Sequence, residues 1–459
     1  MGASRPGRRV AVRGVVARRR GRPHPSRRVR RRARLAPARA PLVRAREGTP
    51  LASFAIQRRP GQGPRLRRGG GVGAPPGRKA MPVSVVVVSY RPEPWLERCL
   101  GSVAGQADEI VVVDNASDGG AASDIATRAG ARLVRMPANV GFARGVNAGV
   151  GVATGDHVAL LNDDAFAEPG WLKSAVDALR EPGVAAVSPK LLLAWPYATV
   201  RLRDPVHQAP GDPRPLGRRL TSVTAGGADA WRYVRGAGVY PDEGGWRWTD
   251  GDATLRVPLL GDGDDVRVNG EPVDVERVGD LVNNAGSYLT AHGEGGDIGY
   301  EEPDDGRFDT ATERFAACGA AMVFSVETWR RVGPFAGDFF AYYEDTDWCW
   351  RARLAGLTVR YDPAGVVRHV HAATSGEWSP RFTYLVSRNR LLCLARNAPA
   401  AVLARELRRS RPLPAGVARS LVRRLPVALA QRRRLARAQT GRAADVWSRW
   451  AGVDAPSRP

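Results

Sequence analysis

The sequence contains no run of about eighteen apolar residues, which is the length that a helix needs to cross a bilayer. We therefore expect no membrane-spanning helix. Cysteine is scarce as well, and the few cysteines are scattered without the spacing of a metal-ligand set. They are Cys99, Cys318, Cys349 and Cys393. This pattern predicts small core residues in a reducing compartment and argues against a disulfide framework.

The turn after the first apolar run lacks the glycine motif G-x-G-x-x-G. A dinucleotide-binding fold needs glycines at this turn, because the backbone there approaches the pyrophosphate closely. Here the run at 82–90 is followed by R-P-E-P-W. The missing motif argues against a nicotinamide-dependent dehydrogenase.

Acidic residues are nearly absent from both ends of the chain. Residues 1–80 contain 24 of the 70 Lys and Arg residues but one acid, and residues 401–459 contain 14 against three acids. The formal net charge of +24 therefore belongs to the ends, and residues 81–400 carry an excess of about ten acids. A nucleic-acid enzyme more often places its basic patch on the folded domain. We predict no nucleic-acid partner.

Residues 1–80 are rich in Arg, Pro and Gly and show no sustained periodicity. Such a segment cannot bury enough surface to offset its conformational entropy, so we expect disorder. It lacks the apolar core of a secretory signal, although its Arg-rich, acid-poor composition is compatible with a transit peptide. Because Met81 directly precedes the first strand, we hypothesise that the protein begins there. A native peptide from within residues 1–80, found by mass spectrometry, would contradict this.

Between residues 81 and 200, short apolar runs alternate with segments of helical spacing. The runs predict buried strands, and the segments between them predict helices. The predicted strands lie at 82–90, 109–115, 131–137 and 158–161. Their order predicts an α/β fold with a mostly parallel sheet flanked by helices.

The strand at 158–161 is followed by Asn162, Asp163 and Asp164. In open α/β sheets, ligands bind at the carboxyl ends of the strands. Two adjacent acids there repel each other and lose hydration, so a positive group should lie beside them. A divalent metal that holds a diphosphate is one candidate. The alternative is an aspartate that caps the next helix.

The pattern changes from residue 201 to 305, where turn pairs and Trp-rich alternation predict an antiparallel β-rich insertion. Asn269-Gly270 predicts a two-residue hairpin turn. The side chains of Trp231, Trp246 and Trp248 could stack on sugar rings, but the favoured interpretation is the core of a small β module.

The α/β pattern returns in residues 306–400. Glu344 and Asp345 lie close to the amino end of a predicted helix, where the helix dipole favours an ionised carboxylate. Asp345 therefore suits a general base; its alternative role is helix capping, for which Asp347 is better placed. Downstream, the spacing of His369 and His371 predicts that both lie on one face of a strand.

The tail at 401–459 is rich in arginine, with Leu, Val and Ala between the arginines. Basic amphipathic helices of this kind often lie on anionic membrane surfaces. A solvated charged tail is the alternative, and the sequence does not decide between them.

A series of motifs in this order resembles the family 2 glycosyltransferases of the GT-A fold, most closely their bacterial rhamnosyltransferase-like branch. The motifs are VVVVSYRPEPWLERCLGSV, VVVDNASDG, NVGFARGVNAG, ALLNDDA, ACGAAMVFSVETWRRVGPF, FFAYYEDTDWCWR, HVHAATSG and RNRLLCLARNAP. They cover about 81–400 apart from the insertion. The resemblance implies a GT-A-type sheet with a nucleotide-sugar-binding half at 81–200 and an acceptor and catalytic-base half at 306–400.

The resemblance also implies roles for single residues. On the donor side it implies contacts with base or ribose for Tyr90, Asp114 and Asn115, and with the diphosphate-sugar for Arg144 and Asn147. Asn162, Asp163 and Asp164 occupy the D-x-D position, with Asp164 as a metal ligand and Asn162 toward ribose or metal-bound water. Asp345, beside Glu344, matches the catalytic base. His369 resembles a histidine that completes the metal site, with His371 as its competitor.

These implications describe an inverting transferase. A divalent cation, Mn²⁺ or Mg²⁺, would stabilise the diphosphate that leaves, and a histidine ligand favours Mn²⁺. The expected donor is a dTDP- or UDP-sugar and the expected acceptor a glycan or polyprenyl-linked sugar of cell-envelope polysaccharide, at the cytoplasmic face of the membrane. Rhamnose is the first candidate, galactofuranose or another hexose the second. A glycoside hydrolase and a non-catalytic sugar-binding protein are the remote alternatives.

Overall fold

The computed structural model describes residues 81–371 and 379–453, apart from residues 93, 262 and 264. All of them belong to one unit, Pro76–Pro459. Our expectation of disorder in residues 1–80 lies outside the described residues.

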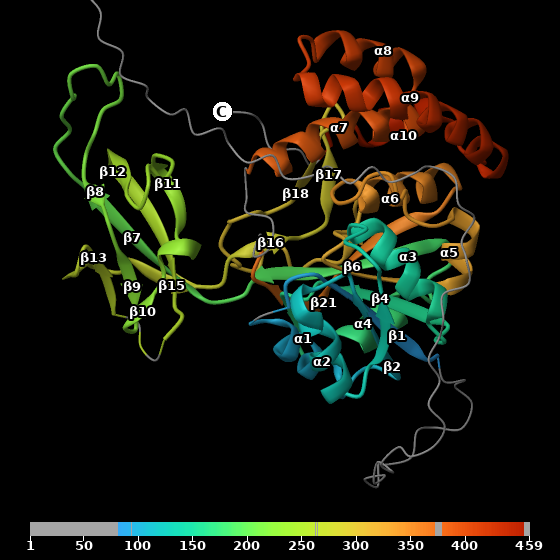
Figure 1. Cartoon of the computed structure of the whole chain (residues 1–459), viewed down its shortest axis with the longest axis horizontal. Coiled ribbons are helices and arrows are strands. Elements are labelled where there is room, and N and C mark those ends of the chain that lie inside the picture. The colour runs from blue at the N-terminus through green and yellow to red at the C-terminus, as the bar shows by residue number, and fades with distance from the viewer. Residues whose placement is uncertain (1–80, 93, 262, 264, 372–378, 454–459) are drawn as a thin grey trace, which may run out of the picture. The chain divides into compact units, whose positions relative to one another are not determined.

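A ten-stranded sheet organises the fold, with its main strands in the order β19-β21-β6-β20-β4-β1-β2-β3 (Figure 1). These strands are β1 (Val83–Ser89), β2 (Glu109–Asp114), β3 (Arg132–Arg135), β4 (His157–Leu161), β6 (Val184–Leu193), β19 (Thr312–Glu313), β20 (Ala321–Ser325) and β21 (Thr358–His369). Strands β1 to β4 are parallel, as are β6 and β21, and β20 runs antiparallel between β4 and β6. The predicted α/β fold with a mostly parallel sheet is confirmed.

Helices cover both faces of this sheet, as the unbroken apolar runs require. Along β1, Val86 and Val88 belong to one hydrophobic cluster, and Val85 and Val87 belong to another. The first cluster includes α3 (Phe142–Val152), α5 (Val326–Val332), α6 (Glu344–Leu354) and α7 (Pro380–Asn397). The second includes α1 (Leu96–Val103), α2 (Ala121–Arg128) and α4 (Trp171–Ala178). Two strands complete the sheet: β5 (Ala165–Ala167) pairs with β21, and β16 (Val282–Asn284) pairs with β6.

Two smaller antiparallel sheets lie between β6 and β16 in the sequence. They contain β7 (Tyr197–Arg203), β8 (Arg219–Leu220), β9 (Val223–Ala225), β10 (Ala228–Asp229), β11 (Arg235–Val239), β12 (Arg247–Pro258), β13 (Val266–Val268), β14 (Glu271–Pro272) and β15 (Arg277–Gly279). Asn269 and Gly270 connect β13 to β14 with φ angles of 55° and 86°, so the predicted two-residue hairpin turn is confirmed. Trp231 packs against the core of these sheets. The boundaries at 201 and 305 stay a prediction.

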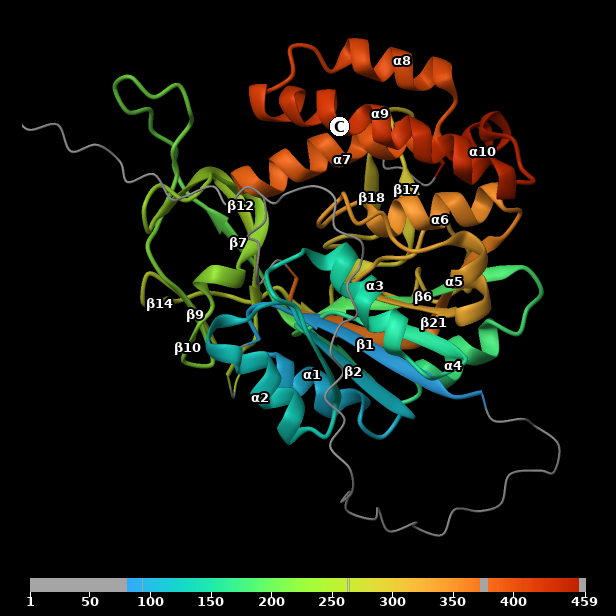
Figure 2. The ribbon, with the colours of Figure 1, turned by 45° about the vertical axis from the view of Figure 1, so that its right-hand side comes forward.

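The C-terminal helices pack on the α/β body. They are α8 (Ala400–Arg409), α9 (Ala415–Leu435) and α10 (Ala443–Trp450), and Figure 2 shows α8 and α9 beside α7. On α10, Trp450 is buried beneath the Arg353 guanidinium, 4.0 Å from its ring centroid. No helix among the described residues is long and apolar enough to cross a membrane, as the sequence predicts. All four cysteines are free, and three of them are buried.

Candidate active site

Polar residues at the ends of β1, β4 and β21 meet at one edge of the large sheet. The Ser89 hydroxyl, at the end of β1, donates to Asp163 Oδ2 at 2.7 Å. The backbone amide of Asn162, just past the end of β4, donates to the Ala320 carbonyl at 2.9 Å. His369 ends β21 and pairs with Ala165 across the strands. The parallel pairing of β1 with β4 and the antiparallel pairing of β5 with β21 therefore bring together segments that lie far apart in the sequence.

A further contact at this edge joins Asp164 and His369, both buried. His369 Nε2 lies 3.1 Å from Asp164 Oδ1, and His369 Nδ1 lies 2.8 Å from Asn283 Oδ1. A carbonyl oxygen only accepts, so Nδ1 carries the hydrogen. In a neutral imidazole, Nε2 would then offer its lone pair to a cation bound beside Asp164. Histidines that bind metals are held in this way by an acceptor on the other ring nitrogen.

This pair fits a divalent cation. Two ligands at about 2.1 Å from an octahedral ion lie about 3.0 Å apart, close to the observed distance of 3.1 Å. Among the described residues, no group of three or more His, Cys, Asp and Glu side chains is arranged to hold a metal ion. The chain would supply two ligands, and diphosphate oxygens and water would supply the others, as Mg²⁺ sites commonly do.

The two adjacent aspartates titrate in opposite directions. Burial and the charge of Asp164 raise the pKa of Asp163, although the hydrogen bond from Ser89 opposes the shift. Burial also raises the pKa of Asp164, but the interactions with His369 outweigh it and hold that pKa below its ordinary value. Asp164 is therefore the ionised member of the pair at neutral pH, as a metal ligand must be.

His371 does not share a strand face with His369, so that prediction is wrong. Strand β21 ends at His369, and His371 has a φ of 61°, a left-handed conformation that turns the chain out of the strand. Its ring packs edge-on against His369, with centroids 5.6 Å apart, and against Tyr300 at 5.3 Å. Burial, followed by His369, lowers the pKa of His371 to about 3.

Asp345 reaches the same edge from the first turn of α6. Its Oδ2 accepts from the Gly319 amide at 2.7 Å, and its Oδ1 accepts from the Thr346 amide at 2.6 Å. Gly319 directly precedes Ala320, which pairs with Asn162, so Asp345 lies close to the strand that carries Asp163 and Asp164. Burial outweighs these hydrogen bonds and raises the pKa of Asp345. We expected the helix dipole to favour the carboxylate, but the net shift has the opposite sign.

A strained loop delivers Asp345 to this position. Phe340, Tyr342 and Tyr343 all have φ near 70°, a conformation that side chains other than glycine seldom adopt. The Asn389 amide on α7 donates to the carbonyls of Phe339, Ala341 and Tyr342 at 2.7–3.0 Å. These three bonds offset the strain and fix the start of α6.

Glu344 lies beside Asp345 but differs from it in environment. It is 5% exposed, and its Oε2 has no hydrogen-bond partner in the described part of the chain. Burial, Asp345 and Asp347 raise the pKa of Glu344 well above its ordinary value. This shift favours the protonated form of Glu344, so its environment suits an ionised base less well than that of Asp345.

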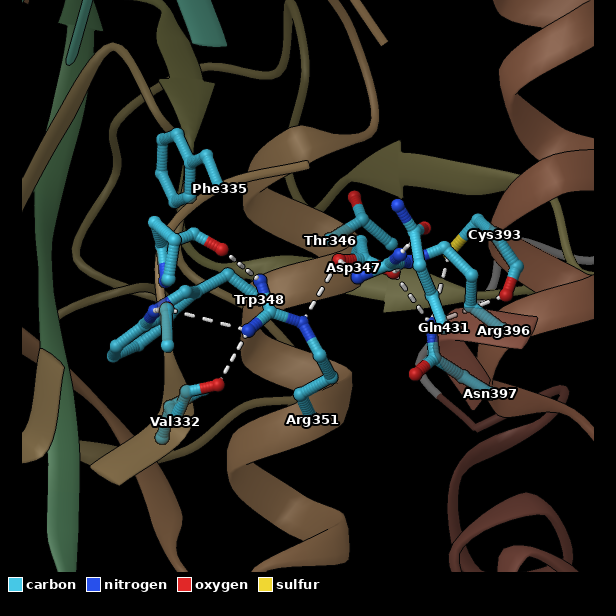
Figure 3. Close-up of polar contacts among 12 residues, drawn as sticks. Val332, Phe335, Thr346, Asp347, Trp348, Arg351, Cys393, Arg396, Asn397 and Gln431 are labelled. Carbon is cyan, nitrogen blue, oxygen red and sulfur yellow. Dashed lines mark hydrogen bonds and ion pairs between the residues drawn. The ribbon is translucent and has the colours of Figure 1, made fainter. Parts of the chain in front are cut away.

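Asp347 accepts hydrogen bonds from a set of buried arginine and asparagine side chains (Figure 3). It is fully buried and accepts from Arg351 Nε at 2.9 Å, from Arg396 Nε at 2.6 Å and from Asn397 Nδ2 at 2.8 Å. Arg396 also donates to Gln431 on α9. Asp347 does not cap α6, whose cap residue is Tyr343, so our assignment of Asp347 as the better cap is wrong. Instead it joins α6 to α7 and α9.

The residues expected around the nucleotide are largely engaged with the protein itself. Asp114 accepts from the Ser117 amide at 2.8 Å and from the Ser123 hydroxyl. Asn115 bonds to Asn139 and to the Val140 amide, which orders the loop before α3. Tyr90 follows the end of β1 and is half-buried. Asp114 and Tyr90 thus lie at the edge where a nucleotide would bind.

Arg144 and Asn147 both contact the loop before α6. Both amide atoms of Asn147 pair with the Phe335 backbone at 3.0 Å. Arg144 Nε donates to the Gly337 carbonyl at 3.2 Å, and 58% of its side chain is exposed. The predicted role at the diphosphate-sugar is thus compatible with Arg144, whereas Asn147 holds the loop.

Sequence patterns gave no reason to single out Ser89, Asn283, Asp297 or Asn389. Ser89 could have been found from its place at the end of the first strand. Asn283 could not, because it depends on the pairing of β16 with β6. Asp297 accepts from Asn284 at 2.6 Å, and Asp345 and His369 act on its ionisation.

Part of the chain matches the model of a known protein family. Residues 84–194 match the model described as glycosyl transferase family 2. No protein of curated function matches the sequence. Nothing found supports the rhamnosyltransferase-like branch in particular.

Several solved structures match the chain at low sequence identity. GalNAc-T7, with UDP, GalNAc and Mn²⁺, is 11% identical over 81% of this chain, with a TM-score of 0.46, and the chain spans 58% of its length. Mannosyltransferase PcManGT from Pyrobaculum calidifontis, with GDP-Man and Mn²⁺, is 17% identical over 80% of this chain and 78% of its own, with a TM-score of 0.35. TarS 1–349 from S. aureus is 13% identical over 78% of this chain and 88% of its own, with a TM-score of 0.33. Because each score is below 0.5, we draw no conclusion about activity from these three. Residues 84–194 are thus similar to glycosyltransferase family 2, and they lie within an α/β body with a mostly parallel sheet flanked by helices.

Proposed function

We propose that the protein is an inverting glycosyltransferase, which moves a sugar from a nucleoside-diphosphate donor to a hydroxyl of a glycan or lipid-linked acceptor. One observation carries the proposal: the Asp164–His369 pair and Asp345 lie at the same edge of a sheet that contains a family 2 segment. They come from positions about 180 residues apart in the chain, so local structure alone does not explain their meeting.

The donor would bind on the side of β1, β2 and β4. Asp164 and His369 would hold a divalent cation, Mn²⁺ or Mg²⁺, with Asn162 and Asp163 beside it. When bound, the cation stabilises the negative charge that develops on the leaving diphosphate. Tyr90 and Asp114 would meet the base and ribose, and Asn115 would support them through the loop that it orders.

The acceptor would enter on the side of α6. Asp345 would take the proton from the attacking hydroxyl, and its raised pKa suits this role, because a base is most effective when its pKa approaches the working pH. One base on the face opposite the leaving group gives in-line displacement with inversion. Glu344, whose pKa is raised by burial, would support Asp345 rather than replace it.

The proposal also names candidates for the donor sugar. Rhamnose from dTDP-rhamnose is our first candidate, and galactofuranose or another hexose from a UDP-sugar is the second; cell-envelope polysaccharide is the proposed pathway. The test is incubation with Mn²⁺ and a panel of radiolabelled dTDP- and UDP-sugars. We expect one donor to be consumed by the wild type and not by the Asp345→Asn variant. A sugar-binding protein would consume none, and a glycoside hydrolase would cleave glycosides without a nucleotide sugar.

We further propose that α9 rests on an anionic membrane surface at the cytoplasmic face. Its sequence contains no acid, and Val422 is 78% exposed among exposed arginines. These arginines are Arg419, Arg423, Arg433 and Arg434. Apolar side chains between cations favour partial insertion into anionic lipid.

Point variants test the membrane proposal better than truncation, because α9 packs on α7 and Arg396 binds Gln431. Replacing Arg423, Arg433 and Arg434 with Glu should abolish sedimentation with vesicles that contain phosphatidylglycerol. The matched control replaces three exposed arginines of the β-rich insertion with Glu. These are Arg203, Arg232 and Arg277. This control should leave sedimentation with the vesicles unchanged. Equal sedimentation of both triple variants would refute the proposal.

A further inference from the structure

Asp297 is a carboxylate at the candidate site to which no role has been given. It ends β18 (Gly295–Asp297), which pairs with β17 (Ser287–Leu289) in a two-stranded sheet. The Gly295 amide of the same strand donates to the Tyr343 hydroxyl at 3.1 Å. This contact places the hairpin against the start of α6, where Asp345 lies.

A single strand holds both Asp297 and the candidate metal ligand. On β16, Asn283 lies 2.8 Å from His369, and the next residue, Asn284, donates to Asp297 Oδ1 at 2.6 Å. Both asparagines are buried, and β16 is anchored to β6 in the large sheet. The position of Asp297 relative to His369 is therefore fixed by adjacent residues of one strand.

Asp297 is half-buried, and its partners differ from those of the buried carboxylates Asp347 and Glu406. Asp347 is neutralised by Arg351 and Arg396, and Glu406 by Arg390 and Arg405. Asp297 has a neutral amide as its partner and forms no ion pair with any described residue. Asp297 is half-buried and is not neutralised by a cation of the described chain, so its carboxylate stays accessible to a ligand that donates hydrogen bonds.

The surroundings of Asp297 contain a buried polar atom without a partner. Glu344 is 5% exposed, and its Oε2 has no partner among the described residues. Cys318 lies within electrostatic range of three carboxyl groups, those of Asp297, Asp345 and Glu344, which add to the effect of burial in raising its pKa. The hydrogen bonds from Gly319 to Asp345 and from Gly295 to Tyr343 hold β18 and the segment before β20 against the start of α6, where Glu344 and Asp345 lie.

We propose that Asp297 contacts the acceptor, receiving a hydroxyl group of the acceptor sugar next to the hydroxyl that Asp345 deprotonates. Sugar hydroxyls are donors, and an ionised carboxylate offers only acceptor positions. The inference rests on the proposed glycosyl transfer. It makes Asp297 a determinant of acceptor choice, distinct from the donor and metal residues.

The test compares transfer with donor hydrolysis in the full-length protein. The probes are the radiolabelled nucleotide sugar that the wild type consumes and a panel of octyl monoglycosides as acceptors. Asp297→Asn should lower kcat/KM for the preferred octyl glycoside about ten- to a hundredfold, which is the usual loss when a hydrogen bond to a charged group is removed. The KM for the donor and the rate of donor hydrolysis by water should change less than about twofold. Asp297→Glu, which keeps the charge, should recover part of the transfer.

The control is Glu294→Gln, which changes a carboxylate next to the same strand and should leave the transfer unchanged. Circular dichroism and the melting temperature establish that each variant is folded, and Asp297→Ser serves as a second variant if Asp297→Asn is not. Unchanged transfer, or an equal loss of transfer and hydrolysis, would overturn the role of Asp297 while leaving the glycosyltransferase proposal standing. A wild type that consumes no donor would overturn both.

Discussion

Asp345 and Asp347 lie two residues apart in one helical turn, yet their surroundings give them opposite ionisation behaviour. Burial raises the pKa of Asp345, whereas Arg396 and Arg351 outweigh burial and hold the pKa of Asp347 below its ordinary value. The first is suited to exchange a proton, and the second is suited to keep its charge. Both belong to the segment E-D-T-D, so residue type alone did not separate them.

The pH dependence of activity should follow Asp345. Its pKa lies above that of an ordinary aspartate, so kcat/KM should fall on the acid side at a higher pH than an exposed carboxylate would give. Thr346 Oγ1 also donates to Asp345, at 3.2 Å, and stabilises the ionised form. Thr346→Val should therefore move the acid limb of the pH profile further upward. An acid limb that is unmoved in Thr346→Val would contradict the assignment.

Replacing Asp347 with Asn should destabilise the fold strongly. Removal of one partner from a buried ionic network costs about 3–5 kcal/mol, because the remaining charges stay buried and unpaired. Urea denaturation at pH 7 measures this loss. The pKa of Asp347 is depressed in the folded state, so its contribution is present at neutral pH and is lost as the pH falls through that pKa. Asp177→Asn, in an exposed i,i+4 pair with Lys173, is the control and should cost less than about 1 kcal/mol.

Among the elements, α3 shows how the glycines of the sequence set a packing distance. A Cβ at Gly149 would lie 2.4 Å from Val86 Cγ1, and one at Gly145 would lie 2.6 Å from Val88 Cγ1. The small-residue helix therefore lies closer to β1 than a helix with larger side chains could. Its far side carries Arg144 and Asn147, which hold the loop before α6.

Two glycine substitutions in α3 should have opposite effects. Gly149→Ala should destabilise the protein by about 1–3 kcal/mol, because the added methyl group overpacks the contact with Val86. Gly151→Ala has nothing within 4 Å of the new Cβ and should stabilise the helix by about 0.5–1 kcal/mol. Thermal unfolding of the two variants measures both changes in stability. A destabilised Gly151→Ala variant would show that backbone conformation, and not packing, controls this helix.

The elements that the sequence predicted well are those with local signals. The strands β1, β2 and β4 follow from unbroken apolar runs, and the Asn269-Gly270 turn follows from two residues that tolerate positive φ. The contact between Asn283 and His369 joins residues 86 positions apart and requires β16 to pair with β6, which no local pattern reveals. The prediction that His371 shares a strand face with His369 was wrong for a related reason, because the residue at which β21 ends cannot be located from spacing alone.

At the scale of the whole molecule, helices α7 and α9 hold the loop and the helix that position Asp345. Asn389 on α7 holds the strained loop before Asp345, and Arg396 ties α6 to Gln431 on α9. We had treated residues from 401 onward as a tail, because arginine-rich composition resembles a solvated appendage. The buried Glu406, bonded to Arg390 and Arg405, shows that part of this charge is internal.

The central claim is a division of labour between Asp164, which holds the cation and donor, and Asp345, which activates the acceptor. Titration calorimetry with UDP or dTDP in the presence of Mn²⁺, run beside a turnover assay, tests it most directly. Asp345→Asn should bind the nucleotide with a Kd within about threefold of the wild type and lose at least a hundredfold in turnover, as loss of a general base commonly gives. Asp164→Asn should lose the Mn²⁺-dependent part of binding. Full turnover by Asp345→Asn, or nucleotide binding by Asp164→Asn that still responds to Mn²⁺, would contradict the account.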